Sequence, residues 1–358
     1  MESKVYFVAA DGSENPESLA RKARAAYLKI GLQEELERDD FVALKIHFGE
    51  KNNKGFINPA WLRGVISEVR IKTPRAFLTD SNTLYVGQRS NSVDHIRLAW
   101  SHGFTPDVVD LPVIIADGLI GRDKHETKGA HGRIAAAKIS SAFLNSDAIL
   151  CLTHVTGHVQ TGIGAALKNL GMGCASRAGK LDQHSVVHPR VKKKACRNCG
   201  LCLDYCPAQA ITPAEGHVVI DDRKCIGCGE CIVVCKYGAI KLTWDEDYKR
   251  IQEKVAEYAL YVHRIFKGKS GYLNFLTKIT KDCDCMAKDD PRIVDDIGIL
   301  ASRDPVAIDK ATADLVIKRS GGKDPFRAGY DIDWGDQLRH AVKIGLGSMD
   351  YDLIEISS

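Results

Sequence analysis

Eight cysteines in one short stretch have the clearest chemistry in this sequence. Four follow the spacing C-x2-C-x2-C-x3-C and four repeat it 29 residues later: Cys196, Cys199, Cys202, Cys206, Cys225, Cys228, Cys231 and Cys235. Three thiolates so spaced can wrap one cubane cluster, and the fourth ligates the neighbouring cluster. Zinc would explain paired C-x2-C units but not the third cysteine of each run. The stretch therefore predicts two [4Fe–4S] clusters.

The crossed spacing assigns four sulfurs to each cluster. Cluster I takes Cys196, Cys199, Cys202 and Cys235, and cluster II takes Cys206, Cys225, Cys228 and Cys231. Glycines in the ligand loops let backbone N–H groups approach the sulfurs. Apolar side chains are expected to exclude water, namely Ile211, Val219, Ile226, Ile232 and Ile240. The stretch resembles the bacterial two-cluster ferredoxins over residues 190–243, which implies one-electron transfer at each cluster.

Composition and charge narrow the class of protein. With 44% apolar and 27% charged residues, the 358-residue chain is typical of a soluble globular protein. Residues 190–243 hold nine Lys/Arg and five Asp/Glu, and two clusters of about −2 each would cancel that surplus. We therefore expect no nucleic-acid partner. No apolar run reaches the ~20 residues of a membrane span, and Met1–Ala10 reads as a strand instead of a signal peptide, so we expect a cytoplasmic protein.

Short apolar runs alternate with helical periodicity outside the cysteine-rich stretch. The predicted strands are Lys4–Ala9, Phe41–Ile46, Ala76–Thr79, Val113–Ala116, Ala148–Leu152 and Ile297–Ala301. The predicted helices are Pro16–Ile30, Pro59–Ile71, Ser92–His102, Gly162–Leu170, Tyr248–Phe266 and Pro305–Ser320. This alternation predicts an α/β fold, a layered domain with a mostly parallel sheet, interrupted by a small α+β ferredoxin-like domain.

The cysteine-rich stretch interrupts the α/β domain. We expect residues 1–189 and 244–358 to form one discontinuous domain, and residues 190–243 to form the ferredoxin domain. Such an insertion is tolerated when the two ends of the insert lie close together.

Several stretches outside the insert resemble the DUF362 family. They are Lys45–Gly49, Thr79–Thr83, Ala116–Gly118, Gly164–Gly173, Asp282–Met286 and Ile299–Asp309. The resemblance covers nearly the whole chain outside the insert, and family members often carry a ferredoxin unit in this position. It implies a fold but no particular reaction.

The pair Cys283-Asp-Cys285 is the main candidate site outside the insert. Two thiolates one residue apart can share a metal or a third cluster, and such a small ring makes them poor disulfide partners. Lys281, if near, would lower their pKa. A metal site needs further ligands, for which the candidates are Cys174, His154, His158 and His47. A redox-active thiol pair, or a turn with two inert cysteines, is the alternative.

Other polar residues follow the predicted strands and should meet at the carboxyl edge of the sheet. His154 and His158 follow the run Ala148–Leu152, with Gly157 between them favouring a loop. The glycines Gly162 and Gly164 could open a helix whose N–H groups hold an anion, with Lys168 further along; helix packing through small residues is the alternative. Lys45 and His47 end the second strand, and Asp80 ends the third.

We interpret these features as an iron–sulfur oxidoreductase. Electrons would pass from a redox partner, a ferredoxin or flavoprotein, through the two clusters to Cys283 and Cys285, with Lys168 assisting catalysis on a small-molecule substrate. One alternative is a non-catalytic electron carrier or docking subunit of a larger redox complex. Another is a metal or cluster handling factor that uses Cys283 and Cys285. Substrate, direction of electron flow and oligomeric state are not encoded in any motif.

Overall fold

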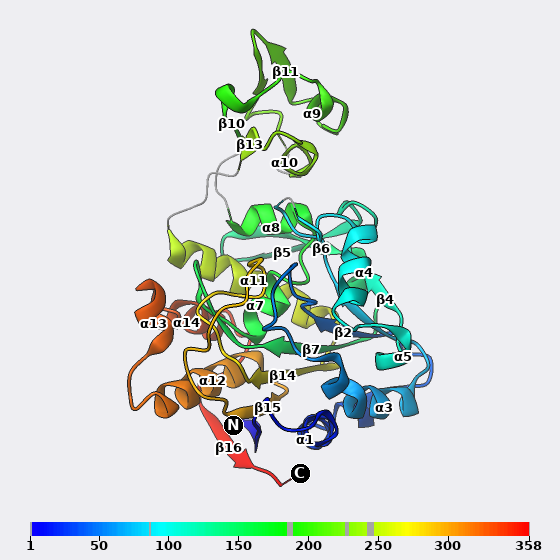
Figure 1. Ribbon diagram of the computed structural model, residues 1–358, viewed down its shortest axis with the longest axis vertical. Coiled ribbons are helices and arrows are strands. Elements are labelled where there is room, and N and C mark those ends of the chain that lie inside the picture. The colour runs from blue at the N-terminus through cyan, green and yellow to red at the C-terminus, as the bar shows by residue number, and fades with distance from the viewer. Residues whose placement is uncertain (1, 86, 185–188, 226–228, 242–246, 358) are drawn as a thin grey trace.

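An eight-stranded sheet forms the centre of the protein (Figure 1). The computed structural model describes residues 2–85, 87–184, 189–225, 229–241 and 247–357. The strands run in the order β16-β1-β15-β14-β7-β2-β3-β4. Their bounds are β1 (Ser3–Ala9), β2 (Val42–Ile46), β3 (Ala76–Asp80), β4 (Val113–Ile115), β7 (Ala148–His154), β14 (Ser270–Leu276), β15 (Gly298–Ser302) and β16 (Tyr351–Glu355). Within this sheet, strand β15 pairs antiparallel with β1 and with β14, and the other strand pairs are parallel. The predicted α/β class with a mostly parallel sheet is confirmed.

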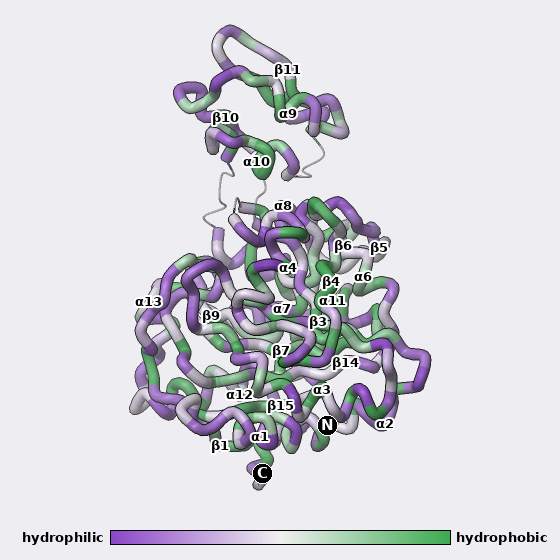
Figure 2. Tube along the Cα trace, turned by 45° about the vertical axis from the view of Figure 1, so that its right-hand side comes forward, coloured by the Kyte–Doolittle hydropathy of each residue, from purple (hydrophilic) through white to green (hydrophobic). Residues whose placement is uncertain are grey.

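Strand β7 illustrates why the predicted strands are continuous apolar runs. All seven of its residues are buried. Ile149 and Cys151 face one core cluster, whereas Leu150 and Leu152 face the other, because side chains alternate across a strand. Figure 2 shows hydrophobic residues gathered around the central strands and hydrophilic ones at the periphery. All six predicted strands are present. Two strands of the sheet were missed: β14, in which polar residues such as Asn274 interrupt the apolar run, and the short edge strand β16.

Helices cover both faces of the sheet. Helices α1 and α3 pack on one core cluster, and α7, α11 and α12 pack on the other. The helices of the α/β body are α1 (Pro16–Lys29), α2 (Leu32–Glu35), η1 (Pro59–Leu62), α3 (Arg63–Lys72), α4 (Ser92–Ser101), α5 (Pro106–Val109), α6 (Ser141–Leu144), α7 (Ala166–Gly171), α8 (Arg177–His184), α11 (Tyr248–Ile265), α12 (Pro305–Arg319), α13 (Pro325–Tyr330) and α14 (Gly335–Lys343). Side-chain caps start several of them; Asp304, for example, accepts hydrogen bonds from the N–H groups of Val306 and Ala307 in α12.

The predicted helix Gly162–Leu170 begins later than expected. Residues Gly162–Gly164 form strand β9, which pairs with β8 (Thr156–His158), and helix α7 begins at Ala166. A second hairpin, β5 (Lys124–His131) with β6 (Ile134–Ser140), flanks the body. The buried carboxylate of Asp309 accepts hydrogen bonds from the N–H groups of Ala166 and Leu167, both at 2.8 Å. The first turn of α7 is thus capped by a side chain of α12.

The cysteine-rich segment forms small elements of its own. Strand β10 (Arg190–Val191) pairs antiparallel with β13 (Ile240–Lys241), so both ends of the segment lie side by side. Between them lie η2 (Lys193–Ala195), α9 (Leu201–Asp204), β11 (Ile211–Ala214), β12 (His217–Ile220) and α10 (Glu230–Val234). Figure 1 shows this segment beyond the α8 end of the body, with α10 nearer the body than β11. The division into domains at 189/190 and 243/244 stays a prediction, and residues 243 and 244 lie outside the described residues.

Asp309 should be among the side chains that stabilise the body most. Besides the two N–H groups of α7, it accepts a hydrogen bond from Asn274 of β14 at 2.9 Å. We predict that Asp309→Ala lowers the free energy of unfolding by about 3 kcal/mol, because buried donors lose their acceptor. The control variant Asp336→Ala removes an ion pair with the half-exposed Arg339 and should cost under about 1 kcal/mol. Urea unfolding, followed by far-UV circular dichroism, measures the free energy of unfolding of both variants. An equal loss in the two variants would contradict the prediction.

Candidate functional site

Three of the four cysteines predicted for cluster II line one cavity. Cys206, Cys225 and Cys231 come from different turns of the segment and face the same space. Its wall also includes Ala208, Ala210, Ile211 and Ile220 of the same segment. Three thiol sulfurs against an apolar wall fit a thiolate-held cluster shielded from water. The fourth predicted ligand, Cys228, lies outside the described residues, as do Ile226 and Gly227.

The four cysteines predicted for cluster I also lie within electrostatic reach of one another. Burial, together with negative charge on Cys235, Cys196 and Cys199, raises the pKa of Cys202 to about 11. Cys235 belongs to the second cysteine run, so a residue of each run acts on Cys202; the crossed ligation itself stays a prediction. Cys199 is exposed, whereas Cys202 is buried.

Backbone N–H groups contact sulfurs in both halves of the repeat. Ala210 donates to Cys206 Sγ and Ala239 donates to Cys235 Sγ, each at 3.2 Å. These two pairs are related by the 29-residue offset, and such bonds stabilise thiolate ligands. The donors are alanines four residues after the sulfur. The described ligand-loop glycines Gly200 and Gly229, by contrast, have positive φ, and Gly229 also allows close approach of Leu84.

The apolar residues around the cysteines are buried as predicted, with one exception. Ile211, Ile232 and Ile240 lie in one buried cluster. Val219 is exposed, and its neighbour Val218 is buried in its place. The prediction for Val219 was wrong by one residue because β12 alternates its side chains between core and solvent.

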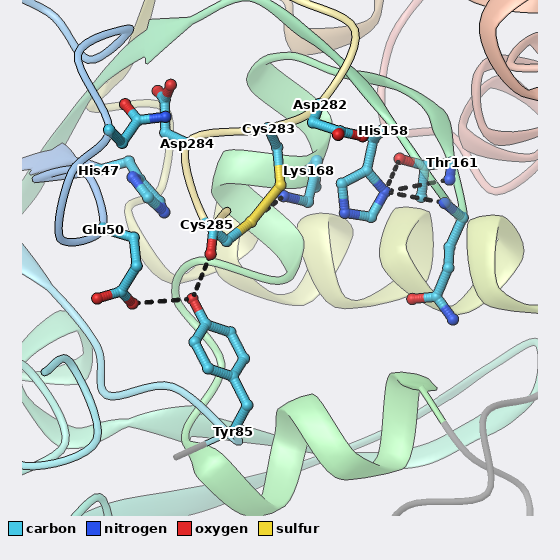
Figure 3. The surroundings of a disulfide bond; sticks show 12 residues. His47, Glu50, Tyr85, His158, Thr161, Lys168, Asp282, Cys283, Asp284 and Cys285 are labelled. Atoms are coloured by element: carbon cyan, nitrogen blue, oxygen red, sulfur yellow. Dashed lines mark hydrogen bonds between the residues drawn. A yellow bond between two sulfur atoms is a disulfide. The ribbon is translucent and has the colours of Figure 1, made fainter. Parts of the chain in front are cut away.

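In the body, the structure joins Cys283 and Cys285 in a disulfide (Figure 3). The expectation that they are poor disulfide partners was wrong. A turn closed by the Met286 N–H on the Cys283 carbonyl (2.9 Å) holds the two Cα atoms 5.3 Å apart. That separation lies in the ordinary range for disulfides.

His158 is the histidine that reaches this pair. One ligand atom each from His158, Cys283 and Cys285 lie within 4.8 Å of one another. The Nδ1 of His158 accepts hydrogen bonds from the backbone N–H groups of Thr161 at 3.2 Å and of Gln160 at 3.3 Å. Burial lowers the pKa of His158 well below its usual value, so the ring is neutral and its proton lies on Nε2. Two thiolates would fit a soft metal ion when the disulfide is reduced, and His158 would join them as a ligand once its Nε2 proton is displaced.

Gly157 explains how His158 comes so close to the loop of Cys283. A Cβ at Gly157 would meet the Lys281 carbonyl oxygen at 2.2 Å. The Gly157 N–H donates to the Thr280 carbonyl at 2.8 Å. A side chain here would therefore push strand β8 away from the cysteine loop.

Lys168, not Lys281, is the cation beside the cysteines. Its Nζ lies 4.0 Å from Cys285 Sγ. Burial, and then the charge of Arg89, lower the pKa of Lys168 to about 8. Lys281 instead places its Nζ 4.9 Å from the centre of the Tyr330 ring. Lys281 is therefore not placed to act on the two cysteines as expected. Lys168 is the cation that lies beside Cys285 instead.

The other predicted ligands are engaged elsewhere. His154 uses both ring nitrogens, at 2.9 Å from Asp284 Oδ2 and 2.8 Å from the Thr277 carbonyl. Burial acts to lower the pKa of His154, but Asp284 raises it. This pair holds the loop that carries the two cysteines. Cys174 is buried beneath Asn169. Figure 3 shows His47 on the side of Cys285 opposite His158.

The polar ends of the second and third strands form a buried network. Lys45 Nζ lies 3.0 Å from Asp80 Oδ1 and 2.6 Å from Asn169 Oδ1. Burial acts to raise the pKa of Asp80, but Lys45 and other cations hold it well below the usual value. Lys45 and Asp80 are almost completely buried from solvent. We therefore assign them a structural role, which is to hold α7 in place. Asn169 links this ion pair to the helix that carries Lys168.

The predicted anion site at the start of α7 is already filled. The N–H groups of Ala166 and Leu167 bind the carboxylate of Asp309. The expectation that Gly162 and Gly164 open an anion-binding helix was therefore wrong: they belong to strand β9.

Sequence reasoning missed Tyr85, Glu50 and Arg89. The Tyr85 hydroxyl lies 3.2 Å from the Cys285 carbonyl oxygen, to which it donates, and 3.3 Å from Glu50 Oε2. Arg89 contacts both Tyr85 and Glu50. No motif marks these residues, because only the tertiary fold brings Glu50, Tyr85 and Arg89 to the cysteines.

Comparison with known proteins matches the chain in two parts. The family described as "Domain of unknown function (DUF362)" matches residues 42–314. The chain is 36% identical over 50 residues to the putative electron transport protein YsaA of Escherichia coli, covering 13% of this chain and 32% of that protein. It is 41% identical over 58 residues to an uncharacterized ferredoxin of Methanocaldococcus jannaschii, covering 16% and 34%. It is also 33% identical over 92 residues to a tetrathionate reductase subunit of Salmonella typhimurium, covering 25% and 35%.

The chain spans about a third of the length of these relatives. A crystal structure of a protein from Thermotoga maritima superposes with a TM-score of 0.44 at 8% identity, covering 88% of this chain and 61% of that one; this likeness carries no functional argument. Among the described residues, no helix has the length and apolar character that crossing a bilayer requires. The cysteine-rich segment is a ferredoxin-like iron–sulfur electron-transport region.

The contact between Lys168 and Cys285 predicts a pH-dependent thiol reactivity. In protein with the disulfide reduced, Lys168→Met should slow alkylation of Cys285 at pH 7 by about tenfold, because the nearby cation that stabilises the reactive thiolate is lost. The difference should shrink above pH 8, where wild-type Lys168 loses its proton. Alkylation rates by peptide mass spectrometry measure this. Lys281→Met is the control, and equal effects of both variants would contradict the assignment.

Proposed function

The chain belongs to the DUF362 family, and we propose that it is an iron–sulfur oxidoreductase in which two [4Fe–4S] clusters deliver electrons to Cys283 and Cys285. The observation that carries the proposal is the disulfide of Cys283 and Cys285 beside Lys168 in the body. A disulfide takes up two electrons, which matches two clusters that each carry one electron when bound.

Residues of both cysteine runs would hold the clusters. Cys196, Cys199, Cys202 and Cys235 would hold cluster I, and Cys206, Cys225, Cys228 and Cys231 would hold cluster II. The shared cavity of three cluster II cysteines and the proximity of the four cluster I cysteines support this pairing.

Reduction of the disulfide balances with the groups at this site. Two electrons and two protons break the S–S bond and leave thiols on Cys283 and Cys285. Lys168, with a pKa of about 8, can carry a proton at neutral pH and stabilise the Cys285 thiolate at Sγ. The reduced pair would then pass two electrons to a small-molecule substrate. The electron source would be a one-electron carrier, a ferredoxin or flavoprotein.

One observation favours an alternative role for the same residues. His158 lies within ligand range of both cysteines, so the reduced pair could bind a soft metal ion. The protein would then handle a metal or cluster, and the electrons would serve to open the site. On this alternative, reduced protein binds about one Zn²⁺ beyond its iron, and Cys283→Ser abolishes that binding.

The names of relatives favour a second alternative. Proteins named as subunits of a tetrathionate reductase and of a selenate reductase share part of their sequence with this chain. The protein could likewise be a non-catalytic electron carrier or docking subunit. On this alternative, Cys283 and Cys285 take no part in electron uptake.

Electron counting tests the proposal. Anaerobic protein should contain about eight iron and eight sulfide. Titration with a reduced viologen should consume about four electrons, two for the clusters and two for the disulfide. Two thiols should become alkylatable at Cys283 and Cys285. The double variant Cys283→Ser, Cys285→Ser should consume about two electrons fewer, whereas Cys174→Ala should match wild type. Equal uptake by the double variant and wild type would overturn the proposal.

A further inference from the structure

We infer that cluster II hands electrons to the body, and that Leu84 and Tyr85 form the bridge from it to the disulfide of Cys283 and Cys285. This inference rests on the proposed function and names its internal route. Every step of the route is a contact between described residues.

The first observation is a buried ion pair next to a cluster II ligand. Glu230 directly precedes Cys231, and its carboxylate lies 3.3 Å from Arg177 and 3.2 Å from Arg122. Glu230 and Arg177 are buried to 2% and 0% exposure. A charge pair withdrawn from water tolerates little displacement, because either charge alone would be buried without a partner. The pair therefore fixes this side of the ferredoxin segment on the body.

The second observation concerns the residue before another cluster II ligand. Tyr205 directly precedes Cys206. Its carbonyl accepts a hydrogen bond from Arg122 at 3.1 Å, and the Arg122 guanidinium lies 5.8 Å from the centre of its ring. Both arginines thus contact residues adjacent to cluster II cysteines.

The third observation is the close approach of the body to the cluster II loop. Gly229 has φ +77°, and a Cβ there would meet the Leu84 side chain at 2.7 Å. Leu84 is buried in one apolar cluster with Cys231 and Ile232. Gly200, 29 residues earlier, has the same backbone conformation (φ +78°) with nothing within 4 Å of its Cβ position. Only the cluster II half of the repeat touches the body at this position.

The fourth observation connects the same loop to the disulfide. Tyr85 follows Leu84, and its hydroxyl donates to the Cys285 carbonyl, 3.2 Å away. Arg177 donates to the Thr83 carbonyl at 3.3 Å. One short segment thus contacts the cluster II loop through Leu84 and the disulfide loop through Tyr85. These two residues are neighbours in the chain, with Cα atoms about 3.8 Å apart, so a single peptide unit joins the two contacts.

The cluster I side of the segment is exposed at Cys199, although Cys202 is buried in the same apolar cluster as Leu84. Among the described residues, the Cβ positions of Gly200 and Gly238 have nothing within 4 Å. Figure 1 shows α10 facing the body, with α9 and β11 on its far side. An external donor can therefore approach cluster I at Cys199, while Leu84 of the body packs on the loop that carries Cys231. Electrons would pass from cluster I to cluster II and then through Leu84 and Tyr85.

Matched charge reversals test the docking step. Glu230→Lys places a third cation beside Arg177 and Arg122, whereas Glu215→Lys makes the same change at an exposed site of the same segment. Clusters are reduced with a viologen radical, and the thiols of Cys283 and Cys285 are counted over time by alkylation. We expect Glu230→Lys to slow thiol formation by about tenfold or more with unchanged cluster content, and Glu215→Lys to match wild type. Hydrogen exchange of the peptide containing Leu84 and Tyr85 should rise in Glu230→Lys only, with or without clusters.

A pair of leucine truncations tests the bridge itself. Leu84 and Leu181 are both body residues, each 3% exposed, in the apolar cluster shared with the ferredoxin segment. Leu84→Ala should slow thiol formation by about tenfold, and Leu181→Ala should leave it near the wild-type rate, since only Leu84 adjoins Tyr85. Equal rates in Leu84→Ala and wild type, with clusters fully reduced, would overturn the inference.

The outcomes separate this inference from the proposed function. A small phosphine reduces the disulfide without clusters, and its rate should be unchanged in every variant if the site is intact. If wild-type clusters reduce but no thiols form, the proposed function fails and the bridge with it. If wild type forms thiols and all four variants match it, only the bridge fails.

Discussion

The buried guanidinium of Arg177 is the interaction that links the two parts of this protein. Inside the body it donates to the carbonyl groups of Thr83, Ser90 and Ile120, and across the boundary it meets the carboxylate of Glu230. Burial lowers the pKa of Arg177, while Glu230 opposes that effect. A buried charge needs every one of these partners. Thr83, Ser90 and the ferredoxin segment are thereby positioned by one side chain.

A second set of buried charges positions the cysteine loop within the body. Lys45 and Asp80 pair at the carboxyl edge of the sheet and reach α7 through Asn169. Asp309 caps the same helix from the opposite side. Together these contacts place Lys168 beside Cys285, while the pair of His154 and Asp284 anchors the loop. Most polar residues at this edge of the sheet thus hold α7 and the cysteine loop in place. Lys168 lies beside Cys285 as a result.

The disulfide and the proposed metal site would be two states of the same residues. In the structure, Cys283 and Cys285 bond to each other, with one ligand atom of His158 within 4.8 Å of both sulfurs. A metal bound to the thiolates would stabilise the reduced state, because only that state offers the ligands. Under the proposed function, electron delivery and metal binding at this site would therefore be thermodynamically coupled.

The spacing of the eight cysteines determined the iron–sulfur assignment, because ligation by a cubane requires short, specific separations along the chain. Continuous apolar runs likewise determined six strands, since a parallel sheet is buried on both faces. Tertiary structure alone decided which polar residues meet. In the folded protein Lys168, and not Lys281, lies beside Cys285. His158, and not His154, lies near the two cysteines, and Asp309 caps the start of α7. These contacts join residues more than a hundred positions apart, or depend on a turn such as Cys283–Met286. Local periodicity carries no information about either, because packing between distant elements sets them.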